Sequence, residues 1–310
     1  MFRHLSRSFC VLLLIVVAIS DTGCRAISRI GESRQSIAAR RLSRQGQQAM
    51  LSGQWDAAEN LFNDALQVSG NDDRAHQGLA ESLWQRGERD AAIKHMEQAA
   101  RLSAGDPQFV QRLGRMYLDV GRITEANQHS LSALSGDRDS ADVWALRGDC
   151  LNAQGHHDKA LAAYHRALAL KPDFPDVQLQ AAAIYRVQGR YDRVLATLDR
   201  LQEGLGGIEI PAQAEMLRGI AMRQLGQSIE ARRCFARAAT KNPEDADPHL
   251  QIASLCLDQG DLQEARNSVK VAMQLDPIAV REGGWIEQIE NHPKRIERTA
   301  LRENPTTHDW

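Results

Sequence analysis

Few stretches of this chain bring together side chains that could carry out chemistry. His156, His157 and Asp158 are consecutive, and imidazole nitrogens with a carboxylate are ligands that a divalent metal ion accepts. They directly follow Gly155, in a stretch with the polar composition of a turn. A solvated turn is therefore the favoured interpretation of this cluster, ahead of a metal site.

The sequence lacks the compact motifs of common enzyme classes. It contains no GxxxxGK[ST] phosphate loop, no HExxH zinc helix and no GxSxG nucleophile. Glu81, Asp142 and Asp149 could share one surface, but nothing predicts the pocket that acid–base catalysis needs. We therefore expect no catalytic residue, no cofactor and no metal site, and a chain that is not an enzyme.

The cysteines form no CxxC pair that would suggest a zinc site or a redox centre. If the N-terminal segment is removed and Cys24 is modified, three remain, an odd number that does not favour a disulfide framework. The helical pattern described below places these three inside helices, where we expect them to be buried as small apolar residues. They are Cys150, Cys234 and Cys256.

Composition indicates an all-helical chain. Of its 310 residues, 25% are charged and only 5% aromatic, and the good helix formers Ala, Leu, Arg, Gln and Glu dominate. The formal net charge is -2, so no bulk attraction to nucleic acid is expected.

The first 23 residues differ from the rest and have the layout of a signal peptide. A start containing Arg3 and Arg7 precedes an apolar stretch, Phe9 to Ile19, that is too short to span a bilayer core of about 20 residues. Thr22-Gly23-Cys24 follows and resembles the lipobox of bacterial lipoproteins, although Asp21 stands where that family has an apolar residue.

This resemblance implies that Cys24 is lipidated and anchors the chain to the periplasmic side of a membrane. An uncleaved hydrophobic anchor, or a soluble secreted chain with a free Cys24 thiol, are the alternatives. Residues 24–38 then form a tether in which arginines far outnumber acids. They would either contact anionic lipid or act as a solvated linker.

A glycine recurs through most of the chain with a period of 34 residues, interrupted once by a spacing of 37. Small residues recur seven before, five after and twelve after each glycine, with exceptions at Val194 and Leu201. Glycine tolerates the positive φ of a tight turn, and small residues let two helix axes approach closely. The pattern therefore predicts pairs of antiparallel helices joined at Gly53, Gly87, Gly121, Gly155, Gly189, Gly226 and Gly260.

A 34-residue helix–turn–helix with these columns resembles the tetratricopeptide-repeat (TPR) family. The fourth repeat carries the resemblance best, with Trp144, Gly148, Leu151, Gly155, Ala160, Tyr164, Ala167 and Pro172. The family implies an all-α, right-handed superhelical solenoid of antiparallel helix pairs. We expect seven repeats, at 39–72, 73–106, 107–140, 141–174, 175–208, 212–245 and 246–279, followed by a capping helix and a disordered tail at 280–310.

In TPR proteins the first helices of successive repeats line a concave groove. The inward positions carried over to this chain are basic in the early repeats, at Arg40, Arg74, Arg112 and Arg115. They are apolar in the later repeats, at Leu146, Leu179, Met216, Leu217, Ile220 and Leu250. An exposed apolar stripe would suit a peptide or helix, whereas residues at these positions could instead be core packing between repeats.

These features lead to one functional hypothesis with two alternatives. We expect an exported, membrane-anchored scaffold that binds a peptide or helical segment of an envelope protein in its groove. An arginine-lined groove for a glycan or anionic polymer is the first alternative, and a non-catalytic subunit of an enzyme complex is the second.

Overall fold

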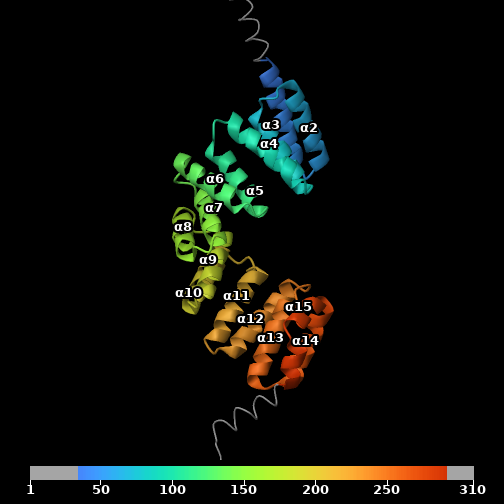
Figure 1. The fold of residues 1–310 in the computed structure, drawn as a ribbon, viewed down its shortest axis with the longest axis vertical. Helices are drawn as coiled ribbons and strands as arrows, with labels where there is room; N and C mark the ends of the chain where they lie inside the picture. Colours follow the sequence, from blue (N-terminus) through green and yellow to red (C-terminus); the bar gives the residue numbers. More distant parts are fainter. Residues whose placement is uncertain (1–33, 292–310) are drawn as a thin grey trace, which may run out of the picture. The chain divides into compact units, whose positions relative to one another are not determined.

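The computed structural model describes residues 34–291, and all regular structure in this range is helical (Figure 1). The predicted all-α fold is therefore confirmed. No helix among these residues is long and apolar enough to cross a membrane. The expected signal peptide at 1–23, the lipidation site Cys24 and the part of the tail from residue 292 onward lie outside the described residues.

The chain divides into two compact units, residues 1–155 and 156–310. The described part of unit 1 begins with a helix at 34–51. The remaining helices of unit 1 are α2 (Trp55–Val68), α3 (Asp73–Gln85), α4 (Arg89–Leu102), α5 (Pro107–Asp119), α6 (Ile123–Gly136) and α7 (Ala141–Ala153). Helix α3 packs against α4, and α5 packs against α6, so antiparallel pairs build the unit.

Unit 2 has the same construction. Its helices are α8 (His157–Leu170), α9 (Pro175–Val187), α10 (Tyr191–Gly204), α11 (Ala212–Gln224), α12 (Ser228–Lys241), α13 (Asp247–Gln259), α14 (Leu262–Leu275) and α15 (Pro277–Glu282). A last helical stretch covers 285–291. Helix α9 packs against α10, α11 against α12, and α13 against α14.

The first described helix includes residues 34–38, which the sequence analysis assigned to the basic tether. The predicted start of the first repeat at residue 39 therefore lies inside this helix. Between Gly31 and Gly46 the chain holds no proline or glycine, so nothing in this stretch interrupts helix formation. Of the predicted tether, only residues 24–33 lie outside the described range.

The glycines of the 34-residue period close the first helix of each pair. All seven have positive φ, between 69° and 85°, as the turn requires. At the C-terminal end of α3, for example, Gly87 N–H donates to the Trp84 carbonyl and Glu88 N–H to the Leu83 carbonyl. These bonds satisfy carbonyls that the end of a helix leaves without partners.

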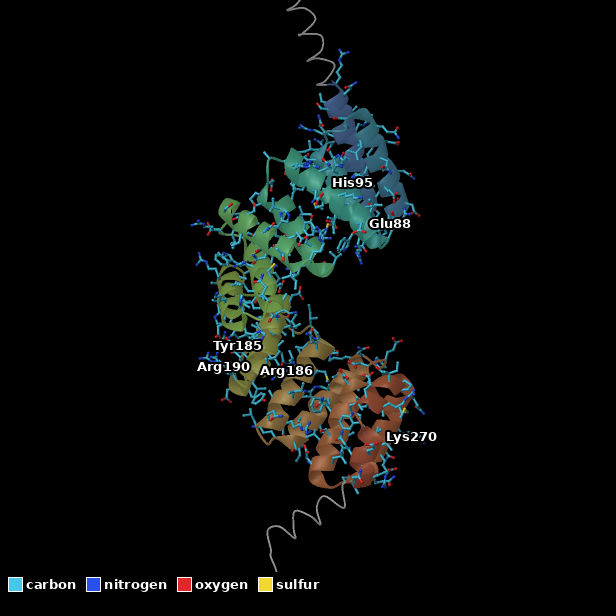
Figure 2. All side chains as sticks on the ribbon, in the orientation of Figure 1. Glu88, His95, Tyr185, Arg186, Arg190 and Lys270 are labelled. Carbon is cyan, nitrogen blue, oxygen red and sulfur yellow. The ribbon has the colours of Figure 1, made fainter. Side chains whose placement is uncertain are left out.

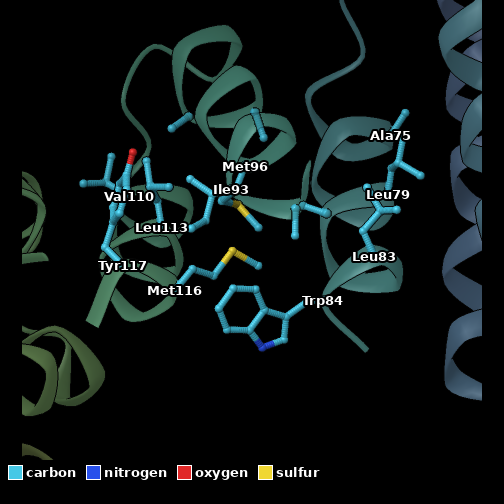
Figure 3. Close-up of a cluster of buried hydrophobic side chains, with 14 of the residues drawn as sticks. Ala75, Leu79, Leu83, Trp84, Ile93, Met96, Val110, Leu113, Met116 and Tyr117 are labelled. Atoms are coloured by element: carbon cyan, nitrogen blue, oxygen red, sulfur yellow. The ribbon is translucent and has the colours of Figure 1, made fainter. Parts of the chain in front are cut away.

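A buried aromatic ring fastens the first three helices of unit 1 together. Phe62 of α2 is fully buried, between Gly46 on the first helix and Gly78 on α3. A Cβ atom added at Gly78 would come within 2.1 Å of the ring, so only glycine allows this approach. The neighbouring core continues through α3, α4 and α5, where Trp84 lies beside Met116 (Figure 3).

In unit 2, a phenylalanine packed against a glycine holds α11 and α12 together in the same way. Phe235 of α12 is fully buried, and a Cβ atom added at Gly219 of α11 would lie 2.5 Å from its ring. Beyond it, Val280 of α15 and Ile289 of the last helical stretch are buried in the same cluster as α13 and α14. These two segments cover the apolar surface that the last helix pair would otherwise expose.

The remaining cysteines are buried, as expected. Cys150, Cys234 and Cys256 are free thiols in α7, α12 and α13, and each is at most 3% exposed. Burial is the main cause that raises the pKa of all three thiols. We therefore assign them a packing role.

Candidate functional site

In unit 1 the charged side chains of the first helices form a connected surface. We call Glu81 of α3, Arg112, Arg115 and Asp119 of α5, and Asp149 of α7 the charged first-helix face. The three α5 residues are spaced by three and four positions, which places them on one side of that helix. Their partners come from the first helices of the repeats before and after.

Arg112 and Glu81 form the most regular contact of this face. The Arg112 Nε and Nη2 atoms each donate to one carboxylate oxygen of Glu81 at 2.6 Å. The Arg112 guanidinium also lies 5.8 Å from the centre of the Trp84 ring, and that of Arg89 lies 4.1 Å from it. Hydrogen bonding to Glu81 is the main cause that raises the pKa of Arg112. This two-bond geometry fixes the guanidinium in place.

A second ion pair joins Arg115 to Asp149 of α7. Asp119 lies close to both arginines, and the pKa of its carboxyl is raised because burial outweighs their attraction. The face is thus an alternating arrangement of positive and negative groups that links three repeats. Its charges largely neutralise one another.

This pairing limits what the predicted basic positions of the early repeats offer to an anionic ligand. Arg112 and Arg115 are neutralised by acids one repeat away, so they do not form a row of free positive charges for a glycan or an anionic polymer. Arg40 and Arg74 are exposed, and among residues 34–291 neither side chain takes part in an ion pair. Two separate exposed arginines are a weak basis for polymer binding.

Most of the predicted apolar groove residues lie in the core. Leu146 is fully buried and approaches Gly114 of the previous repeat, where an added Cβ atom would lie 2.8 Å from its Cδ2 atom. Leu179, Leu217 and Leu250 are each 6% exposed. For these four leucines the structure favours the alternative, packing between repeats, because the adjoining helices cover their side chains.

Met216 and Ile220 differ from these leucines, and we call the two residues the α11 apolar stripe. They are four positions apart on α11, so they lie on one side of the helix. Both are only partly buried, and they pack at the border of the cluster that contains Leu250. Of the six predicted apolar residues, these two keep an accessible surface for a partner.

The stripe has a charged neighbour on its own helix. Arg223, one turn further along α11, donates to Asp258 of α13 at 2.6 Å. The stripe thus combines a small apolar surface with polar groups at its edge, which is the usual composition of a protein-binding patch.

The histidines and the carboxylate that follow Gly155 were weighed as a metal site in the sequence. Within the described range, no group of three or more His, Cys, Asp or Glu side chains is arranged to hold a metal ion. His156 is exposed in the turn before α8, whereas His157 and Asp158 are the first two residues of that helix.

Comparison with known proteins gives one consistent result. Family models described as tetratricopeptide repeat match residues 49–96, 83–150, 151–205 and 216–277, which is more than half of the chain. The fold is similar to the crystal structure of PilW, a widely conserved type IV pilus biogenesis factor, with a TM-score of 0.61 at 19% identity. That match covers 67% of this chain and 94% of PilW.

Two curated relatives show how far the similarity extends. The human protein O-mannosyl-transferase TMTC1 is 26% identical over 223 residues, which cover 69% of this chain but only 24% of the relative. Lipopolysaccharide assembly protein B of Escherichia coli K12 is 24% identical over 263 residues, covering 80% of this chain and 66% of the relative. The chain thus spans only part of the length of these relatives.

Proposed function

Because the chain belongs to the tetratricopeptide-repeat family, we propose that it is a non-catalytic scaffold that binds a segment of a partner protein along its first helices. The observation that carries this proposal is the α11 apolar stripe. Met216 and Ile220 stay partly exposed where the neighbouring predicted groove residues are buried. An accessible apolar pair with charged groups at its edge suits one apolar side of a peptide or helix.

The alternating charges of unit 1 support the same kind of partner. A half-buried face on which Arg112 and Glu81 are already paired offers hydrogen-bonding groups in fixed positions. A polar peptide segment can add to such a face without bringing a matching net charge. We therefore favour a protein partner over an anionic polymer.

The proposal predicts that replacing both Met216 and Ile220 with glutamate abolishes partner binding. Two carboxylates would have to be desolvated against the apolar side of the partner. This desolvation costs more free energy than the contact with the partner contributes. The measurement is the set of proteins retained from solubilised envelopes by the full chain and by the variant. We expect a partner that wild type retains at both low and high salt and that the variant loses.

A matched control distinguishes the loss of the binding surface from unfolding of the chain. Ile229 of α12 is 65% exposed and Val271 of α14 is 39% exposed, and both lie on second helices. Replacing these two residues with glutamate makes the same chemical change away from the first helices. If both double variants keep their helical circular dichroism but lose the partner equally, or if neither loses it, the stripe is not the binding surface.

We further propose that the chain is exported and anchored through a lipid on Cys24, and that its partner is an envelope protein. The basic start, the apolar stretch from Phe9 to Ile19 and the small residues before Cys24 support this proposal. The names of the similar proteins PilW and lipopolysaccharide assembly protein B, which refer to pilus biogenesis and lipopolysaccharide assembly, agree with it.

Mass spectrometry of the mature protein tests this anchoring. We expect the chain to begin at an acylated Cys24 and to partition with membranes, because an acyl chain contributes about 0.8 kcal/mol for each buried CH₂ group. Cys24→Ser should release it into the soluble fraction. A mature chain that retains residues 1–23, or an unmodified Cys24, would exclude the lipid anchor.

A further inference from the structure

Unit 2 contains a cleft away from the α11 apolar stripe, between α8, α9 and α10. It has a volume of about 390 Å³, at the lower end of the range for small-ligand pockets. Its floor is formed by buried groups, among them Ala181 and Tyr185 of α9 and Thr197 of α10. Its rim is formed by exposed groups, among them His165 of α8 and Arg193 and Arg200 of α10. We call this the α8–α10 cleft.

The polar groups of the floor are held in place by hydrogen bonds. The His165 Nε2 atom lies 2.8 Å from the Tyr185 hydroxyl oxygen, joining rim and floor. The Thr197 hydroxyl donates to the Arg193 carbonyl at 2.8 Å. The Arg190 guanidinium lies 4.9 Å from the centre of the Tyr185 ring, where α9 turns into α10 (Figure 2). The cleft therefore has a defined shape rather than a loose surface.

The charge of the cleft is positive and is not balanced from within it. No acidic residue is among the described residues that line it. Neither Arg193 nor Arg200 forms an ion pair within the described part of the chain. Partial desolvation on the rim is the first cause that lowers the pKa of His165, and the positive charges of Arg200, Arg193 and Arg190 lower it further.

Two acidic residues of this region line a separate cavity. Asp173 and Glu203 line a neighbouring cavity, and Arg200 borders both cavities. Arg193 borders the α8–α10 cleft and is not among the residues that line the cavity of Asp173 and Glu203. Of the two arginines, Arg193 is therefore the one that lines the cleft without also lining the acidic cavity.

We propose that the α8–α10 cleft binds a carboxylate side chain of an acidic peptide segment, with the apolar residue next to it on the cleft floor. A guanidinium fork matches a carboxylate in shape and charge, and Arg193 and Arg200 stand on the same side of α10, seven residues apart. The floor, with Leu168 and Ala181, suits an aliphatic neighbour better than a free inorganic anion. This proposal does not depend on Met216 or Ile220.

Two capped tripeptides and the full-length chain test the proposal. Acetyl-Leu-Glu-Leu-amide is titrated while the imidazole resonances of His165 are followed by nuclear magnetic resonance. Acetyl-Leu-Gln-Leu-amide has nearly the same shape without the charge, and inorganic phosphate is an anion without the apolar part. We expect saturable shifts with the glutamate peptide and at least about tenfold weaker binding of the other two probes.

Variants then locate the contact. Arg193→Gln should weaken binding of the glutamate peptide about tenfold, the loss expected for one charge-assisted hydrogen bond. Arg166→Gln makes the same change at an exposed α8 residue that does not line the cleft, and it should leave binding unchanged. Both residues are exposed, so circular dichroism should show intact helices.

The proposal is overturned by any of three results. These are equal binding of the glutamine peptide, binding of phosphate alone, and unchanged binding by Arg193→Gln. The partner-capture experiment with Met216 and Ile220 concerns a different surface, so its failure would leave this result standing.

Discussion

Replacing Gly78 with alanine is expected to destabilise unit 1 by about 2 kcal/mol. The new Cβ atom would lie 2.1, 2.3 and 2.4 Å from three atoms of the Phe62 ring, and this ring is fully buried. Overpacking of this kind costs about 1–3 kcal/mol, and contacts this short place it at the upper end. Alanine stabilises a helix by about 1 kcal/mol relative to glycine, which is less than the steric cost, so the net effect is destabilising.

Thermal and urea unfolding of the full chain measure this effect. Gly70→Ala is the matched control, because the nearest atom to its added Cβ is 3.9 Å away and its φ is not positive. We expect that control to stay within about 0.5 kcal/mol of wild type. Combining Gly78→Ala with Phe62→Leu should cost less than the sum of the two single changes. Unchanged stability of Gly78→Ala would contradict the packing described for the first three helices.

Replacing Phe235 with alanine is expected to have the larger effect, about 3–5 kcal/mol. The ring is fully buried against Gly219, and the glycine leaves no side chain that could move in to fill the space. A cavity therefore remains where the ring was. The loss of packing contacts around this cavity adds to the loss of the free energy gained by transferring the ring from water to the core. Urea unfolding monitored by circular dichroism provides the measurement.

The control for this change lies on the same helix. Ile229 is 65% exposed, so Ile229→Ala removes a large apolar side chain from α12 without opening a cavity. It should change the free energy of unfolding by about 0.5 kcal/mol or less. If Phe235→Ala were no more damaging than Ile229→Ala, Phe235 would not be the centre of this helix pair.

The repeating columns of the sequence predicted much of this packing. Gly46, Gly114 and Gly219 belong to the column seven residues before the turn glycine, and all three lie where an added Cβ atom would collide with a neighbouring side chain. Gly78 lies outside that column, and the sequence did not identify it. Its importance depends on the reach of Phe62 from another helix, which periodicity does not contain.

The candidate site was predicted less well than the packing of the helices. A leucine at an inward position can be covered by the adjoining helix, as Leu146 is, and the residue type alone does not show this. The pairing of Arg115 with Asp149 left a clearer signal. The two residues are 34 positions apart, one full repeat, so equivalent positions carry opposite charges. Comparing charges one period apart would have identified this ion pair.

The α8–α10 cleft had no such signal in the sequence. His165, Tyr185 and Arg193 come from three helices and follow no motif, and only the packing of α8, α9 and α10 brings them together. The fifth repeat, in which Val194 and Leu201 replace small residues, contributes two of these helices.

The central claim is that a partner protein lies on the first helices of the repeats, and site-specific photo-crosslinking tests it most directly. A benzophenone amino acid is placed at Met216 on the first helix α11, or at Ile229 on the second helix α12, in the full-length chain in its native cells. We predict that position 216 crosslinks one defined protein and that position 229 does not. Crosslinks to that protein from position 229 but not from position 216 would show that the partner occupies the second helices, and would contradict the proposed function.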